Sequence, residues 1–483
     1  MPSLPLLESC QVRTRSIPIL VLLATVLAAS AEVIHLKNGH TIWADHVREN
    51  KNRVDYDVGE ATYAIPRSAV ERVDAGGAPP EYAGSGSATA PVAPDYTPAA
   101  PSFRHEADVV GKVIHDGQVD TAALASLERD KPELAATGYF LAGKHEGDHG
   151  NFPQARRYFE SALRFQPDNV TLLIYYAAVL MRTGHADEAL SYGERAASID
   201  PNSPDAMAML GFAQFANDRT PDAIRSWKES LKLRPDAKVS QYLARAEREA
   251  KAESEYSLRE SSHFTLHFEG KQISQSFPHD VLATLERDYD DLARDLGSSP
   301  SNSILVTLYS SQAFFDVTQA PSWSSAVNDG KLRIPIRGID SVTPELARVL
   351  KHELTHTFVA QMSSGRCPTW LQEGMAQIEE AKSSAPYGHQ LAQLFAANSE
   401  IPLNGLEGSF MAFSGGEATV AYAESLVTVE YIRDTYGMND LSRVLELIGQ
   451  GSSTEAALRS TLHCDYGQLR DEVARWLKNR YGE

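Results

Sequence analysis

A repeat with a period of 34 residues constrains the fold of this 483-residue chain more than any other feature. Gly150 and Gly184 are one period apart, and two further series keep the same spacing in the same phase. The two series are Ala155, Ala189 and Ala223, and Pro167, Pro201 and Pro235. Small residues let two helices approach closely, and a proline ends a helix. The pattern therefore predicts three helix–turn–helix units, over about 135–168, 169–202 and 203–236.

These units resemble the tetratricopeptide repeat (TPR), which has this length and ends in proline. A helix expected at 237–253 caps the stack, and helical pieces at 106–133 could add a degenerate pair, which makes 106–253 an all-α solenoid. The resemblance implies a concave surface that binds a peptide or a protein partner. The alternative is a spacer that only positions the next domain, and the sequence favours neither.

Residues 351–359, KHELTHTFV, contain a His-Glu-x-x-His pattern. Two histidines four positions apart project from one helix face, because four steps of about 100° leave them about 40° apart. His352 and His356 can then bind one metal ion, while Glu353 can reach a metal-bound water without being a ligand. The alternative is a partly buried helix whose side chains are satisfied in other ways.

The ends of this motif helix are marked in the sequence. Thr343 can cap its first turn, Pro344 fits the first helical position, and Glu345 suits the positive end of the helix dipole. The helix is expected to run to about Met362, with Gly365 as the stop just beyond it.

Three stretches before the motif helix suit β-strands, because they alternate or form short apolar runs. They are 262–270, 303–311 and 331–339. A helix is expected between the first two, at about 278–296. Pro335 favours an edge position for the third strand, where an extended substrate could add by β-pairing. Because the chain after residue 369 reads as nearly all helical, 257–483 is predicted to be an α+β domain.

A catalytic zinc needs a third protein ligand and an open fourth position. Glu373, in PTWLQEGMAQ, follows His356 by 17 residues. Pro368 and Thr369 suit a helix start, so a short turn after the motif helix can bring Glu373 back across it. A third ligand is therefore available at a suitable place.

HELTH followed by WLQEGMA resembles the Peptidase-MA-like gluzincins over roughly 260–480. The resemblance implies that His352, His356 and Glu373 bind Zn²⁺ and that Glu353 is the general base of peptide hydrolysis. The third histidine and Met-turn of metzincins are absent, and so is the thermolysin-type Asn-Glu-x-x-x-Asp motif.

A donor that holds the oxyanion usually assists such a reaction. Tyrosine often has this role in gluzincins, and Tyr422 is the candidate here. Its alternative role is packing, with Leu426 and Val429 on the same helix face.

Three functions follow from these patterns. The first is a zinc metallopeptidase whose repeats recruit a protein or peptide substrate or partner. The second is a catalytically weak or inactive zinc-binding scaffold of the cell envelope. The third is a metallohydrolase of a non-peptide bond. The intact Glu353 favours the first function over the second.

The N-terminus resembles a signal peptide. Arg13 and Arg15 precede the apolar run 17–29, which ends at Ala29-Ser30-Ala31. The run is short for a bilayer span, and its end fits signal-peptidase cleavage. Removal of 1–31, export to a bacterial periplasm or cell envelope, and no remaining transmembrane span are therefore expected. An uncleaved anchor is the alternative.

Two short regions follow the apolar run. Residues 32–75 alternate like strands around an Asn38-Gly39 turn, which resembles the small SH3-like β modules of exported proteins. Residues 76–105 are rich in proline, alanine, glycine and serine and are predicted to form a linker. A docking or cell-envelope contact role is possible for the β module.

The remaining composition excludes some partners. A net charge of −19 argues against nucleic acid and anionic membranes as partners. After cleavage two cysteines remain, Cys367 and Cys464, either as a disulfide or as two free thiols. The other histidines of the C-terminal region lack ligand spacing to one another and are read as structural or surface residues. They include His263, His267, His389 and His463.

Overall fold

The computed structural model of this chain separates it into two compact units, Met1–Tyr82 and Ala83–Glu483. The described residues are 32–37, 41–44, 46–51, 53–58, 61–75, 105–270, 274, 276–300, 302–318, 326–328, 330–336, 339, 341–410, 413 and 415–482. The signal peptide predicted at 1–31 and almost all of the linker predicted at 76–105 lie outside these residues. Within them, no helix combines the length and apolarity that a bilayer span requires.

The first unit is a small all-β region, with strands where alternation predicts them. Its strands are β1 (Glu32–Leu36), β2 (Thr41–Ala44), β3 (His46–Glu49), β4 (Arg53–Val58), β5 (Ala61–Pro66) and β6 (Val70–Ala75). They form two three-stranded antiparallel sheets, in the orders β2-β1-β6 and β3-β4-β5. Ile34, Val54 and Val70 are its buried core. The predicted turn residues Asn38 and Gly39 are not among those described.

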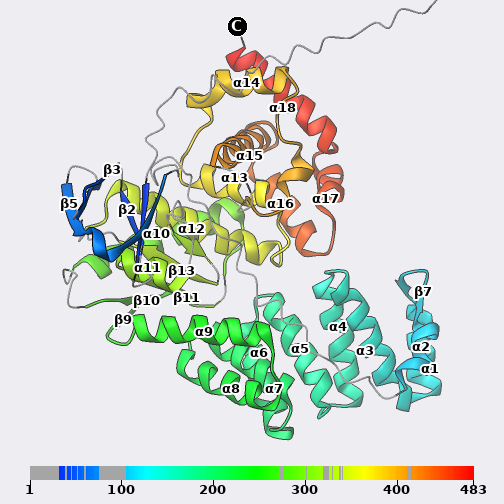
Figure 1. Cartoon of the computed structure of the whole chain (residues 1–483). Coiled ribbons are helices and arrows are strands. Elements are labelled where there is room, and N and C mark those ends of the chain that lie inside the picture. The colour runs from blue at the N-terminus through cyan, green and yellow to red at the C-terminus, as the bar shows by residue number, and fades with distance from the viewer. Residues whose placement is uncertain are drawn as a thin grey trace, which may run out of the picture. The chain divides into compact units, whose positions relative to one another are not determined.

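The second unit begins with a stack of paired helices (Figure 1). Three pairs correspond to the three predicted units, and the first begins at Pro132, three residues before the predicted start. They are α3 (Pro132–Asp148) with α4 (Phe152–Phe165), α5 (Val170–Arg182) with α6 (Ala186–Ile199), and α7 (Pro204–Ala216) with α8 (Thr220–Leu233). The helix expected after them is α9 (Ala237–Ala252). Before them, the predicted degenerate pair is α1 (Glu106–Val113) and α2 (Thr121–Asp130), separated by a hairpin of β7 (Ile114–His115) and β8 (Gln118–Val119).

The small residues of the repeat are the places where its helices meet. Ala155, Ala189 and Ala223 are fully buried. A Cβ atom on Gly211 of α7 would lie 2.5 Å from the ring of Trp227 in α8, so a larger residue there would push the pair apart. The 34-residue period of small residues in the sequence therefore marks the positions where the helices of the repeat are in close contact.

The last domain is built on a five-stranded mixed sheet in the order β12-β13-β11-β10-β9. The strands are β9 (Ser257–Glu260), β10 (Phe264–Phe268), β11 (Ile304–Tyr309), β12 (Val327–Asn328) and β13 (Lys331–Pro335). The strands β10, β11 and β13 are parallel, and β9 and β12 are antiparallel to their neighbours. The helix α10 (Phe277–Leu296) connects β10 to β11, and α11 (Ser311–Thr318) follows β11.

The edge position predicted for 331–339 is wrong. The strand ends at Pro335 and lies inside the sheet, between β11 and the two-residue strand β12. Pro335 is tolerated because it is the last residue of its strand, where a missing N–H costs little. The outer strand β12 is too short to give a pattern of its own, so the sequence shows only its neighbour.

Helices make up the rest of this domain, as the sequence predicts. The motif helix is α12 (Pro344–Met362), and α13 (Thr369–Glu379) follows it after a short turn. The others are α14 (Gly388–Ala396), α15 (Gly415–Tyr436), α16 (Met438–Gly449), α17 (Thr454–Thr461) and α18 (Tyr466–Tyr481), with short 3₁₀ turns at Ala385–Tyr387 and Leu403–Leu406. One hydrophobic core joins the sheet to these helices. Cys367 and Cys464 are free thiols.

Candidate metal centre

The helix α12 has the ends that its sequence predicts. The Thr343 side chain accepts a hydrogen bond from the Leu346 backbone N–H, Pro344 opens the helix, and the last helical residue is Met362. Gly365 follows with a φ of 69°, a conformation that glycine adopts without strain. The cap and the stop together fix where on the helix the two histidines lie.

The helix α13 brings Glu373 to the histidines because it packs very closely against α15. A Cβ atom on Gly374 would lie 2.3 Å from Cγ2 of Val429 and 2.6 Å from the Ser425 carbonyl oxygen. No other residue fits that contact without moving a helix. The Glu-Gly pair in WLQEGMA is therefore explained by two needs, a ligand at 373 and close packing at 374.

The three predicted ligands converge in space. One side-chain donor atom from each of His352, His356 and Glu373 lies within 4.8 Å of the other two. Glu373 Oε2 is 3.6 Å from His352 Nε2 and 3.8 Å from His356 Nε2. Two ligands about 2.0–2.1 Å from a tetrahedral zinc are about 3.4 Å apart. The three side chains therefore need only small shifts to hold one zinc ion.

The chemistry of the donor set also fits a metal. His352, Glu353 and His356 are fully buried, and Glu373 nearly so. Several of their polar atoms lack a hydrogen-bond partner among the described residues: Nε2 of both histidines, Nδ1 of His356, Oε2 of Glu373 and both carboxylate oxygens of Glu353. Unpartnered buried polar atoms are costly and rare, so a cluster of them on neighbouring side chains indicates a ligand. The residues present fit a zinc ion.

Two residues around this cluster were not anticipated from the sequence. The carboxylate of Glu380 lies 3.1 Å from His352 Nδ1 and 2.8 Å from the Lys382 ammonium. A carboxylate on the second nitrogen of a ligand histidine fixes the ring and leaves Nε2 for the metal. The Asn328 amide donates to the Glu353 carbonyl oxygen and to the Thr357 hydroxyl, both at 2.8 Å.

A signal for Glu380 exists in the sequence. It follows Glu373 by seven residues, which is about two helical turns, and it caps the end of α13, so it lies on the same side of that helix as Glu373. The position four residues after Glu373, which suits a carboxylate equally well, holds Gln377. The Gln377 amide instead donates to the backbone carbonyl oxygens of Glu373 and Tyr422.

The ionisation of these groups reflects an excess of buried negative charge. Burial opposes protonation of His352, but the carboxylates of Glu380 and Glu373 outweigh it and raise its pKa to about 10. Burial raises the pKa of Glu353 to about 8 and also raises that of Glu373. Burial, together with the charge on His352, lowers the pKa of His356 well below its usual value. A divalent cation among these groups would balance the carboxylates.

Tyr422 lies close to the same cluster. Its side chain is buried, with its ring edge-on to Phe410 at 5.4 Å. Burial raises its pKa well above the usual value, and the charges of Glu373 and Glu353 act in the same direction. Leu426 and Val429 are buried on the same helix, so Tyr422 is both a packed side chain and a neighbour of the candidate ligands.

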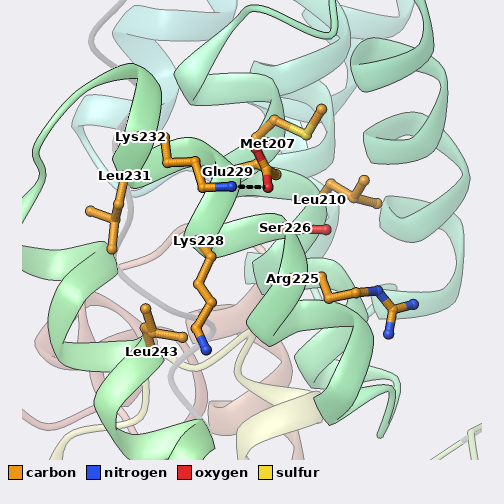
Figure 2. A pocket seen from close by; sticks show the side chains of 9 residues that line it. All are labelled: Met207, Leu210, Arg225, Ser226, Lys228, Glu229, Leu231, Lys232 and Leu243. Atoms are coloured by element: carbon orange, nitrogen blue, oxygen red, sulfur yellow. Dashed lines mark hydrogen bonds and ion pairs between the residues drawn. The ribbon is translucent and has the colours of Figure 1, made fainter.

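A hollow of about 730 Å³ lies elsewhere, among the repeat helices α7, α8 and α9 (Figure 2). Apolar side chains on its walls include Met207, Leu210, Leu231 and Leu243. Its cations already have partners, since Lys228 pairs with Glu247, Lys232 with Glu229 and Arg225 with Asp222. The hollow therefore offers apolar contacts more than free charge.

The comparisons with known proteins agree with this architecture. A family model described as the Peptidase MA superfamily matches residues 287–479, and two tetratricopeptide repeat models match 140–204 and 180–246. The C-terminal region is a Peptidase MA superfamily domain. All the residues of the cluster lie inside the matched range, and proteins of this superfamily are often zinc-dependent.

Matches to solved structures are more distant, and no curated protein matches the chain. The structure titled MamA RS-1 ArsTM double mutant is 20% identical over 26% of this chain and 70% of its own, with a TM-score of 0.24. The structure titled MamA 41-end from Desulfovibrio magneticus RS-1 is 21% identical over 27% of this chain and 75% of its own, also at 0.24.

Proposed function

We propose that this protein is an exported zinc-dependent metallopeptidase. The observation that carries the proposal is the convergence of His352, His356 and Glu373, each with an unpartnered donor atom among the described residues and with donor atoms within 4.8 Å of one another. Membership of the C-terminal region in the Peptidase MA superfamily supports hydrolysis of a peptide bond over other bonds. Export rests on the N-terminal sequence alone.

The roles of the side chains follow from their chemistry. His352, His356 and Glu373 would hold the zinc ion, which when bound supplies a Lewis acid that polarises a carbonyl group and makes water more acidic. Both carboxylate oxygens of Glu353 lack a hydrogen-bond partner among the described residues, so they are available to accept a proton and return it. Glu353 takes the proton of the attacking water and delivers it to the leaving amine. Tyr422, beside Glu373 and Glu353, would donate a hydrogen bond to the oxyanion.

The repeats would bring a protein or peptide to the peptidase domain. Tetratricopeptide repeats suggest protein interaction, and the apolar hollow of Figure 2 is a surface where an apolar segment of such a partner could bind. The acidic net charge makes nucleic acid a poor partner.

A second function, a zinc-binding scaffold without activity, is favoured by one observation. His352, Glu353 and His356 are all fully buried, whereas a catalytic zinc keeps one position open to substrate. A scaffold needs no such opening. A peptidase requires that the site open when substrate arrives.

One experiment separates these functions. Zinc content is measured by elemental analysis, and cleavage of a denatured protein mixture is followed for the wild type, Glu353→Gln and His389→Gln. His389 is an exposed histidine in the same domain and serves as the control. A peptidase binds about one zinc per chain in all three, and only Glu353→Gln loses cleavage. Stoichiometric zinc without cleavage in any of them would leave the scaffold, and zinc-free protein would overturn both functions.

A further inference from the structure

Two strands lie between the repeat helices and the candidate catalytic helix. In the hairpin of β12 and β13, Val327 is opposite Arg333 and Asn328 is opposite Leu332. Residues opposite each other in a sheet point to the same face, and successive residues point to opposite faces. One face of the hairpin therefore carries Val327 and Arg333, and the other carries Asn328 and Leu332.

The first face contacts the last helix of the repeat domain. Arg333 is fully buried, and its guanidinium donates to Glu249 Oε2 of α9 at 2.8 Å. The Lys331 ammonium donates to Glu249 Oε1 at 2.7 Å and to Asp218 Oδ1 at 2.8 Å. Val327 belongs to a small apolar cluster that includes Ala252 at the end of α9. The repeat domain thus binds this face of the hairpin through buried ion pairs and apolar contact.

One residue of this contact, Asp218, departs from the repeat pattern. Asp218 is one period after Gly184 and two periods after Gly150, in the turn between paired helices. All three have positive φ, and Asp218 has 57°. Aspartate adopts this conformation less readily than glycine. The carboxylate gained there binds Lys331 and lies 3.0 Å from His267 Nε2, so the departure occurs where the two domains meet.

The second face contacts the motif helix. Asn328 is fully buried, and its amide donates to the Glu353 carbonyl oxygen and to the Thr357 hydroxyl. The side-chain oxygen of Asn328, Oδ1, accepts a hydrogen bond from the Gly330 N–H at 3.2 Å, which orients the side-chain amide. Leu332 is buried in the core that also contains Leu350 and Leu354 of α12.

We infer that the last repeat helices position the candidate catalytic helix, and that Glu249 and Asp218 act on Glu353 through the hairpin and Asn328. Glu249 holds Lys331, the hairpin links Lys331 to Asn328, and Asn328 holds the backbone of Glu353. The repeats then help to position Glu353 in the peptidase domain, in addition to offering a binding surface. A partner that moves α9 would move the backbone that carries Glu353.

Hydrogen–deuterium exchange of the full chain in excess zinc tests this coupling without relying on the proposed peptidase activity. Glu249→Gln removes the charge at nearly constant shape, and Glu247→Gln, on the exposed side of the same helix, is the control. We expect Glu249→Gln to speed exchange about tenfold in 326–336 and 350–357, while the helices from 132 to 216 keep their protection. The control should leave both segments unchanged.

A double-mutant cycle with Asn328→Ala separates a relay from simple loss of stability. If Asn328 carries the coupling, Glu249→Gln still loosens 326–336 in the Asn328→Ala background but adds nothing at 350–357. An equal effect at 350–357 in both backgrounds would overturn the inference, and so would faster exchange confined to α8 and α9. If Glu249→Gln does not fold, Asp218→Asn replaces it in the same cycle.

Peptide hydrolysis gives a second readout, and this one rests on the proposed function. Glu249→Gln should lower kcat with zinc retained and KM little changed, because it acts on the position of Glu353 and not on substrate contacts. A protein that cleaves nothing would overturn the proposed function alone, since the exchange measurements decide the coupling by themselves.

Discussion

The second unit contains two buried charged clusters that are partnered in opposite ways. Around the motif helix, His352, His356, Glu353 and Glu373 leave polar atoms without partners in the described part of the chain. Between the domains, each carboxylate oxygen of Glu249 faces its own cation. Both clusters are almost wholly buried, so burial alone does not distinguish a site from a structural contact.

The difference lies in what completes each cluster. Charges that find protein partners hold two parts of the fold together, and replacing one of them leaves another charge buried. Charges that point at one another without partners need something from outside the chain, here a cation. The two clusters should therefore respond oppositely. Metal removal should destabilise the protein through the cluster around the motif helix, and replacement of a charge should destabilise it through the cluster between the domains.

The largest effect is expected from removing the metal. His356→Ala, or a strong chelator, should abolish peptide hydrolysis and leave the protein free of zinc. The zinc contribution to the free energy of unfolding should also be lost, which is about 4 kcal/mol for a ligand present at a thousand times its Kd. Thermal denaturation with and without chelator checks this, and the exposed His389→Ala should match the wild type. A melting temperature that chelator leaves unchanged would contradict a metal at this cluster.

The next effect compares the two clusters directly. Arg333→Met leaves Glu249 buried with one cation fewer and should lower the free energy of unfolding by about 3–5 kcal/mol, with or without zinc. Glu353→Gln should lower it little or raise it, because the Glu353 carboxylate has no partner to lose among the residues that the structure describes. Urea denaturation of both variants measures this, with the exposed Arg225→Met as the control for the arginine. Equal losses for Arg333→Met and Glu353→Gln would remove the distinction.

A smaller effect is expected at the residue that orients His352. Glu380→Gln should weaken zinc binding about 10- to 100-fold, as loss of a carboxylate behind a ligand histidine typically does. Competition with a fluorescent chelator measures the affinity. The neighbouring Glu379→Gln, whose carboxylate faces Lys351, should bind zinc like the wild type. Unchanged affinity in Glu380→Gln would show that the ring of His352 is held by packing alone.

Much of this architecture could be predicted from the sequence because its signals are local. The 34-residue period, the cap at Thr343 and the spacing of His352 and His356 each arise within one or two helices. Glu373 could be located because Pro368 and Thr369 indicate a turn and a second helix that return to the histidines, and the family resemblance implied its role as a ligand. The convergence of these three side chains agrees with that resemblance.

The rest could not be predicted because it depends on contacts between distant segments. Lys331 is 113 residues from Asp218 and 82 from Glu249, and no periodic pattern connects them. The inner position of β13 depends on β12, which has two residues. Only Asp218 is visible in the sequence as an exception, because it occupies the turn position that holds glycine in the other two repeats. His267, which the sequence analysis interpreted as a structural or surface residue, lies beside Asp218.

A pH dependence of the contact between the domains should come from His267. The carboxylates of Asp218 and Glu253, 3.0 and 3.5 Å from its ring nitrogens, outweigh burial and raise its pKa to about 9 from an ordinary 6.5. Because the folded value is the higher one, this stabilisation is complete below pH 6.5 and is lost as the pH rises through about 9. We expect the wild type to lose stability relative to His267→Gln between these pH values in urea denaturation with zinc in excess. Parallel pH profiles of the two proteins would show that the histidine is not charged in the folded state.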